Sequence, residues 1–120
     1  MWFKVDDKLC THPKPRKAGL AAMGLWALGG SYAGQQLTNG FVPEWYVISW
    51  PNGKRHAHAL VTAGLWWEDT NDGETGYRFH DWTQSNPTKV QELARREKEA
   101  LRIAAWRAAQ KANGEAVGAA

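Results

Sequence analysis

The first pattern of apolar residues along the chain has helical spacing. Apolar side chains stand at positions i, i+3, i+6 and i+7, namely Leu20, Met23, Trp26 and Ala27, with Leu28 beside them. This spacing predicts a helix over residues 18–36 with that face inward. The interior of the same segment contains Gly24, Gly29, Gly30 and Gly34. Because glycine costs about 1 kcal/mol relative to alanine inside a helix, they indicate either close packing or an irregular helix.

The segments on either side of this helix are shorter. Residues 2–9 alternate loosely between apolar and polar side chains, which indicates a short strand or an extended arm packed on the core. The two prolines within residues 12–15 predict a break in regular structure. After the helix, residues 38–40 predict a turn and residues 41–42 a very short strand.

A short helix is predicted over residues 43–50, because Pro43 and Glu44 suit the first turn of a helix. Its side chains available for the core are Trp45, Val47, Ile48 and Trp50. Residues 51–53, Pro-Asn-Gly, then form a strong turn signal. Two helices separated by a tight turn are therefore expected in this part of the chain.

The second of these helices, residues 54–63, is amphipathic. Its inward stripe consists of Ala57, Leu60, Val61 and Gly64. Its outward face consists of Arg55, His58 and Thr62, with Lys54 at the start. A glycine such as Gly64 is typical of the residue that ends a helix.

A β-hairpin is predicted over residues 65–82. Leu65-Trp66-Trp67 starts one strand, residues 69–76 are rich in turn formers, and residues 77–82 alternate. Tyr77, Phe79 and Asp81 fall on one face, and Arg78, His80 and Trp82 fall on the other. The tip is acidic, with Glu68, Asp69, Asp72 and Glu74 and no Lys or Arg between Trp66 and Tyr77. A hairpin that grips phosphates needs the opposite charge, so we expect this tip not to contact DNA.

A long helix is predicted at the end of the chain. Thr88 and Gln91 have the spacing of a capping box, and the helix is expected over residues 89–112. Its apolar stripe consists of Val90, Leu93, Leu101, Ala104 and Ala108, interrupted by Glu97. This interruption removes the sustained heptads that indicate a coiled coil. Residues 113–120 are expected to form a flexible tail.

The order of predicted elements is helix, short strand, helix, tight turn, helix and hairpin. It predicts a fold that is mainly α with a small β-hairpin, a winged helix-turn-helix followed by a long C-terminal helix. The expected organisation is a winged-helix domain over residues 1–86, a basic helix over residues 87–112 and the tail. In such a fold the helix before the hairpin enters the DNA major groove, and here that helix is 54–63. The alternative is that it is simply a third core helix with a charged outer face.

Charge is distributed unevenly between the two ends of the chain. Residues 1–86 hold eight Lys/Arg and eight Asp/Glu, whereas residues 87–120 hold seven Lys/Arg and four Glu. A basic tail on a neutral domain indicates double-stranded DNA as a polyanionic partner, or else a solvated helix face. The candidate DNA-contacting residues are Lys14, Arg16, Lys17, Lys54, Arg55, His58, Thr62, Arg78, Arg95, Arg96, Lys98, Arg102 and Arg107.

Other chemistries are disfavoured. A single cysteine, Cys10, allows no intrachain disulfide, and the acidic N-terminus is unlike a signal peptide, so a cytoplasmic protein is expected. No apolar run has the length of a membrane span, so no membrane partner is expected. The histidines and cysteine lack zinc-site spacing and no catalytic motif is present, so no metal, cofactor or enzyme activity is expected. Most of the eight tryptophans are expected in the core, with Trp67 and Trp106 as the exposed exceptions.

Five strings of sequence carry a family resemblance. They are Trp2-Phe3-Lys4-Val5-Asp6-Asp7, Ala22-Met23-Gly24-Leu25-Trp26, Thr38-Asn39-Gly40-Phe41-Val42-Pro43, Ala63-Gly64-Leu65-Trp66 and Gly76-Tyr77-Arg78-Phe79-His80-Asp81-Trp82. Over residues 2–88 they resemble a family of small actinobacterial phage and prophage proteins, usually described as helix-turn-helix DNA-binding proteins. The hairpin region is also similar to the N-terminal winged-helix domain of phage replisome organisers. The resemblance implies DNA binding in replication or transcription control, in the cytoplasm of a bacterial host.

Two function hypotheses follow from the sequence. The first is a non-enzymatic phage-type DNA-binding protein that uses the 54–63 helix for the groove and the C-terminal helix for phosphates or for self-association through residues 89–112. The second is an interaction adaptor on a winged-helix scaffold, whose acidic hairpin tip and exposed tryptophan bind a host or phage protein.

Overall fold

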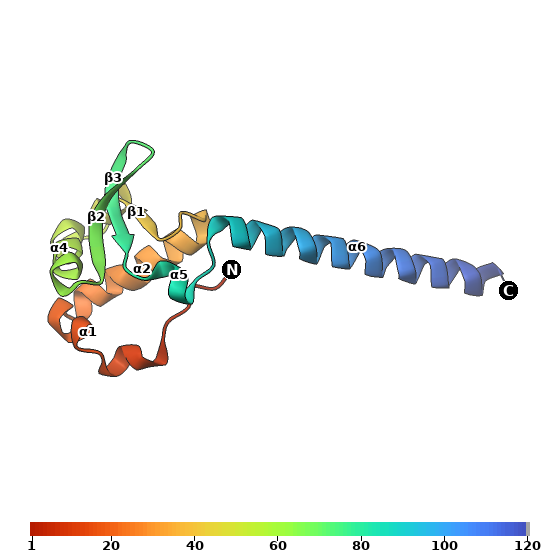
Figure 1. Ribbon diagram of the computed structural model, residues 1–120, viewed down its shortest axis with the longest axis horizontal. Helices are drawn as coiled ribbons and strands as arrows, with labels where there is room; N and C mark the ends of the chain where they lie inside the picture. The colour runs from red at the N-terminus through yellow and green to blue at the C-terminus, as the bar shows by residue number, and fades with distance from the viewer. Residues whose placement is uncertain (120) are drawn as a thin grey trace. The chain divides into compact units, whose positions relative to one another are not determined.

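The computed structural model describes residues 1–119, with side-chain surroundings over residues 1–114, and divides the chain into two compact units at residues 1–89 and 90–120. Figure 1 labels most of the elements. In chain order they are η1 (Asp7–Thr11), α1 (Pro13–Ala18), α2 (Leu20–Gln36), β1 (Phe41–Pro43), α3 (Glu44–Ile48), α4 (Gly53–Ala63), β2 (Trp66–Asn71), β3 (Glu74–Phe79), α5 (Trp82–Ser85) and α6 (Lys89–Ala119). The fold is mainly helical with a small antiparallel sheet, as predicted, and it has one strand pairing that the hairpin prediction did not include.

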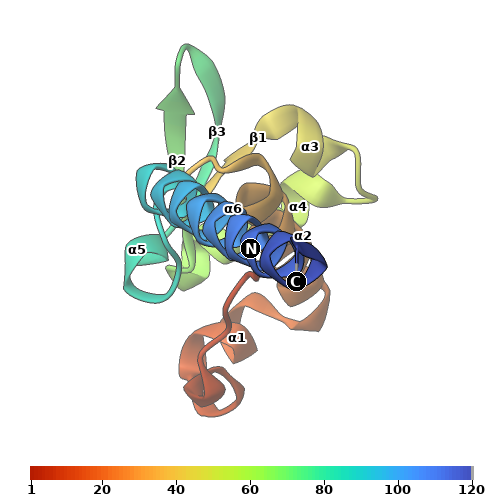
Figure 2. The ribbon, with the colours of Figure 1, turned by 90° about the vertical axis from the view of Figure 1, so that its right-hand side faces the viewer.

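That additional pairing joins β1 to the hairpin. The sheet has the order β1-β3-β2, with Phe41 opposite Arg78 and Trp66 opposite Phe79. The β2–β3 hairpin projects from the domain at the end farthest from α1, as both ribbon views show (Figures 1 and 2). Helix α2 contacts β1 and α4, and α4 contacts β2, so the sheet and these two helices share one core.

The core side of α2 consists of one leucine and five small residues. Its buried positions are Ala22, Leu25, Gly29, Gly30, Ala33 and Gly34. The inward face predicted for this helix is wrong at Leu20, which is 91% exposed, and at Ala27 and Leu28, which are exposed as well. Met23 and Trp26, by contrast, are partly buried and pack against the core. The small face leaves room for aromatic rings from elsewhere. A Cβ on Gly29 would lie 2.7 Å from the Trp66 ring, and one on Gly30 would overlap the ring of Phe3.

The glycines of α2 thus serve close packing, the first of the two alternatives that the sequence offered. Phe3 stacks on Trp82 with ring centroids 5.7 Å apart and meets Trp26 edge-on at 5.1 Å. The backbone N–H of Lys4 donates to the Asn86 side-chain oxygen at 2.9 Å. Residues 2–6 are consequently an extended arm held against the core, rather than a strand.

The break predicted at residues 12–15 is wrong, because a short helix, α1, starts at Pro13. Proline is tolerated in the first turn of a helix, where its missing N–H has no partner to lose. The Nδ1 atom of His12 accepts from the backbone N–H of Lys14 at 3.2 Å, which caps the helix. Two prolines that were interpreted as breakers therefore initiate a helix.

The short helix α3 buries less than predicted. Of its four candidate core residues only Val47 is buried, whereas Trp45, Ile48 and Trp50 are 55%, 58% and 40% exposed. Across the chain Trp66 and Trp82 are buried and Trp26 is partly buried. The other five are 40% exposed or more, so the expectation that most tryptophans lie in the core is wrong.

The turn between α3 and α4 is tightly constrained. Asn52 has a left-handed backbone with φ of 55°, and a Cβ on Gly53 would overlap the carbonyl oxygen of Val47. Only glycine lets the two helices approach this closely. The predicted helix 54–63 is confirmed as α4, and its predicted stripe is confirmed by the burial of Ala57 and Leu60.

The predicted hairpin is confirmed, but its second strand is shifted toward the tip, since β3 covers Glu74–Phe79 rather than residues 77–82. Tyr77 and Phe79 are buried and Arg78 is half-buried, in line with the predicted alternation. β3 ends at Phe79 because Asp81 is left-handed with φ of 58° and Trp82 begins α5. The long C-terminal helix is also present, and α6 continues past Ala112 to Ala119.

Candidate nucleic-acid interface

Helix α4 presents one polar face to solvent. Lys54, Arg55, His58 and Thr62 are all exposed. Their spacing of three and four residues places them on one side of the helix. Ala57, Leu60 and Ala63 anchor the opposite side in the core. Four of the predicted site residues are thus brought together on one rigid element.

The two ends of α4 differ in charge. At its start, the Lys54 ammonium lies 3.7 Å from the Glu44 carboxylate, and both side chains remain well exposed. Lys54 and Glu44 line a groove of about 380 Å³ together with Glu68 and Asp69 from the hairpin. Carboxylates therefore outnumber cations beside the first turn of α4.

Helix α1 brings positive charge to the other end. It packs against α4, and the Lys14 ammonium donates to the carbonyl of Gly64 at 3.3 Å. A cation at a helix C-terminus is favourable, because the last carbonyls there have no partner within the helix. Lys14 is thereby half-buried, while its neighbours Arg16 and Lys17 are exposed.

Arg78, a further predicted site residue, is half-buried, and its side chain is hydrogen-bonded within the domain. Its guanidinium lies 2.6 Å from the Asp69 carboxylate and also donates to the carbonyls of Thr38 and Asn39 and to Asn71. It lies over the Phe41 ring at 5.4 Å. The hydrogen bond from Arg78 holds the pKa of Asp69 below its ordinary value. Arg78 thus fastens the hairpin to the loop before β1.

The basic residues of α6 are partly paired along their own helix. Glu92 accepts from Arg95 and Arg96 at 2.9 and 3.0 Å, and these hydrogen bonds lower its pKa to about 2. Arg102 pairs with Glu99 at 2.6 Å. Over the described side chains, no ion pair involves the exposed Lys98 or Arg107. This helix therefore offers both paired and unpaired cations to a polyanion.

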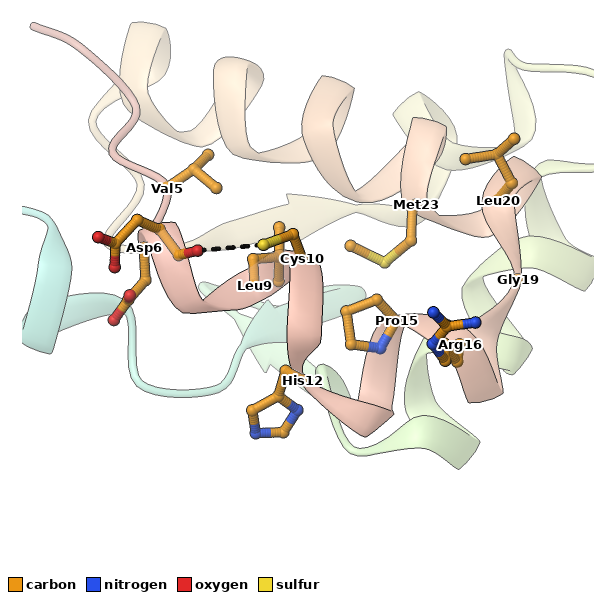
Figure 3. Close-up of a pocket in the computed structure, with 11 residues that line it drawn as sticks. Val5, Asp6, Leu9, Cys10, His12, Pro15, Arg16, Gly19, Leu20 and Met23 are labelled. Atoms are coloured by element: carbon orange, nitrogen blue, oxygen red, sulfur yellow. Dashed lines mark hydrogen bonds between the residues drawn. The ribbon is translucent and has the colours of Figure 1, made fainter.

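A second hollow, which the sequence analysis missed, lies between the arm and α1. Its volume is about 740 Å³, and Figure 3 shows its apolar lining. The apolar lining residues include Val5, Leu9, Pro15, Leu20 and Met23. Cys10 lies at this pocket with its thiol donating to the Asp7 carbonyl at 3.4 Å. No sequence signal indicated the pocket, because it forms where two short helices meet.

An exposed aromatic surface was also missed. We define it as Leu28, Tyr32, Trp45, Ile48 and Trp50, from α2, α3 and the turn after α3. Tyr32 meets Trp45 edge-on at 5.8 Å, and Tyr46 connects Tyr32 to Trp50 through ring contacts at 4.6 and 6.3 Å. Large exposed apolar patches are typical of interaction sites. Its tryptophans were assigned to the core because residue type alone does not reveal which face is covered.

No family model, curated protein or solved structure matches this chain. The resemblance to phage proteins therefore stays a prediction. Over the described residues, none of the helices combines the length and apolar content that crossing a membrane requires. Within the same residues, no group of three His, Cys, Asp or Glu side chains is placed so that it could hold a metal ion.

Proposed function

We propose that this chain is a non-enzymatic DNA-binding protein of phage type, built as a winged helix and acting in replication or transcription control. The observation that carries the proposal is the polar face of α4. It presents Arg55, His58 and Thr62 from the second helix of a helix-turn-helix pair, directly before a hairpin. The strand order β1-β3-β2 supports the winged-helix assignment. In that architecture the corresponding helix enters the major groove.

The charges around α4 support one orientation on the duplex. Helix α1, with Arg16 and Lys17, and the tip of the hairpin lie at opposite ends of the domain, in both ribbon views (Figures 1 and 2). Phosphates attract the first and repel the second. We therefore place the DNA backbone toward α1, with the hairpin tip turned away. This is the reverse of a phosphate-gripping wing, and it gives Arg78 a structural role instead.

The test is a mobility shift and anisotropy titration on duplex DNA at low salt. Arg55→Ala is expected to weaken binding by about 1–3 kcal/mol, if Arg55 makes a bidentate contact with guanine. Lys8→Ala removes the same charge from an exposed site outside α4 and is the matched control. The proposal fails if the purified protein shifts no duplex, or if both variants lose affinity equally.

A second measurement separates phosphate contacts from base contacts. Lys17→Ala is expected to weaken binding to all sequences alike and to reduce the slope of log affinity against log salt by about 1. Truncation after Asn86, which removes α6, is expected to weaken binding further because it removes seven cations. An unchanged salt slope in both variants would assign the phosphate contacts to other residues.

The aromatic surface favours a second candidate function, an adaptor that binds a host or phage protein. Trp45 and Ile48 are more than half exposed, and the acidic groove at Glu44 lies on the same helix. A partner with an apolar side chain flanked by Lys or Arg fits this combination. A pull-down from nuclease-treated bacterial lysate tests it. Trp45→Ala and Glu68→Lys should each abolish capture, and Arg55→Ala should leave it unchanged.

A further inference from the structure

Helix α6 carries an apolar stripe that remains exposed. Val90, Leu93 and Leu101 are 77%, 45% and 66% exposed. Ala94, Ala104 and Ala108 on the same side of the helix are exposed as well. Most helical stability in proteins comes from packing an apolar face rather than from helix propensity. The uncovered stripe of this 31-residue helix is therefore available to pack against a partner.

The stripe has a seven-residue repeat with two charges in it. Val90, Glu97, Ala104 and Lys111 follow one another at intervals of seven residues, and so do Ala94, Leu101 and Ala108. The two sets lie three and four residues apart, which is the spacing of the contact seam between paired helices. Glu97, which interrupts the stripe, is therefore a seam position rather than an outward-facing one.

Glu97 has no cation within reach on its own helix. Its neighbours three and four residues away are Leu93, Ala94, Ala100 and Leu101. Glu92 and Glu99, by contrast, are ion-paired with arginines of the same helix. Within the described part of the chain, no hydrogen bond or ion pair is made by the Glu97 carboxylate. A carboxylate in an apolar seam is favourable only if the covering helix supplies its cation.

The order of the seam charges decides which covering helix fits. In a parallel pair in register, Glu97 faces Glu97 and Lys111 faces Lys111, and like charges are destabilising. In an antiparallel pair centred at Ala104, Glu97 of each helix is level with Lys111 of the other, because both lie seven residues from Ala104. Opposite charges then meet on both sides of the centre. Small residues at the centre let the two backbones approach closely.

We propose that α6 pairs with α6 of a second copy of this chain in an antiparallel arrangement centred near Ala104. The apolar stripe supplies the buried area, and Glu97 and Lys111 fix direction and register. The seam charges match this partner and do not match a parallel partner in register. The inference does not depend on DNA binding, because it concerns residues of the stripe and not the cations on the rest of the helix.

The test uses the full chain in analytical ultracentrifugation over a range of concentrations. Wild type is expected to dimerise reversibly. Glu97→Lys and Lys111→Glu should each weaken the dimer by about tenfold, since two attractive contacts become repulsive. The double variant E97K/K111E should restore wild-type affinity. A parallel pair predicts equal affinity for all four proteins, which would overturn the proposal, as would a monomer at every concentration.

Cysteine cross-linking reads the register directly. In a Cys10→Ser background, Glu97→Cys protein mixed with Lys111→Cys protein should form a mixed disulfide dimer, and neither alone should cross-link efficiently. Trp45→Ala should leave dimerisation unchanged. Loss of the dimer in Trp45→Ala would place the contact on the aromatic surface and overturn the proposal. Far-ultraviolet circular dichroism of every variant confirms that α6 remains helical.

Discussion

The two units of this chain are stabilised in different ways. In residues 1–89, rings from distant parts of the sequence fill a core against glycines of α2, as Phe3 and Trp66 do at Gly30 and Gly29. Along α6, the interactions lie one turn apart, as in the Glu92–Arg95 and Glu99–Arg102 pairs. The first unit is therefore stabilised mainly by close packing of side chains, and the second by ion pairs along one helix. Each should therefore respond to changes that leave the other untouched.

The largest effect is expected from Trp66→Ala. The Trp66 side chain is fully buried against α2, and removing a buried tryptophan costs about 3–5 kcal/mol of unfolding free energy. Trp67→Ala is the matched control, because this neighbour on β2 is 40% exposed. It should cost far less. Urea denaturation of both variants measures the difference, and equal losses would show that shape does not dominate this unit.

A somewhat smaller loss is expected from Gly53→Ala. The added methyl group overlaps the Val47 carbonyl, and overpacking of this kind costs about 1–3 kcal/mol. Gly24→Ala adds the same group to a helix position with nothing within 4 Å. That variant should gain about 0.5–1 kcal/mol through helix propensity. The melting temperature should fall in Gly53→Ala and rise in Gly24→Ala. A shift of the same sign in both variants would contradict the close packing of α3 and α4.

Arg78→Lys should cost less again, about 1–2 kcal/mol, although it keeps the charge. Lysine cannot reproduce the planar fork that reaches Asp69, Asn39 and Asn71 together. Arg55→Lys, on the exposed face of α4, should leave stability unchanged. Chemical denaturation distinguishes the two. If Arg78→Lys leaves the free energy of unfolding unchanged, charge rather than hydrogen-bond geometry holds the hairpin to the loop before β1.

The smallest effect is expected at Glu92, and it should depend on pH. Its pKa falls from 4.5 to about 2 because of Arg95 and Arg96. A lowered pKa means that the ionised carboxylate stabilises the helix above about pH 4.5, and that this contribution is lost as the pH falls toward 2. Glu92→Gln should slightly reduce the helical dichroism at neutral pH, and the difference from wild type should disappear near pH 2. A difference that persists there would implicate packing rather than charge.

Local periodicity carried most of the fold prediction. Helix α4 and the β2–β3 hairpin follow from patterns of spacing that each element contains within itself. The buried face of α2 could not be predicted this way, because it is made mainly of glycine and alanine, and its glycines admit the rings of Phe3 and Trp66 from elsewhere in the chain. The helix α1 was not predicted, because prolines occupy the first turn of a helix only where the preceding residue caps it, as His12 does here.

The part of the candidate interface that lies on α4 could also be predicted from local periodicity. The exposed positions of Lys54, Arg55, His58 and Thr62 follow from one helical repeat. The involvement of Arg78 with Thr38 and Asn39 does not, since it depends on a strand pairing across about forty residues, Phe41 to Arg78. The exposure of Trp45 and Trp50 could not be predicted either, because the spacing of residues 43–50 does not show which face is covered.

The contact between the N-terminal arm and Asn86 has a consequence for synthesis on the ribosome. Phe3 and Lys4 find these partners only when Trp82 and Asn86, about eighty residues later, have been translated. Domains generally fold as units while the chain grows, at about 5–20 residues per second. The arm therefore gains these two contacts only after almost all of residues 1–89 has been translated.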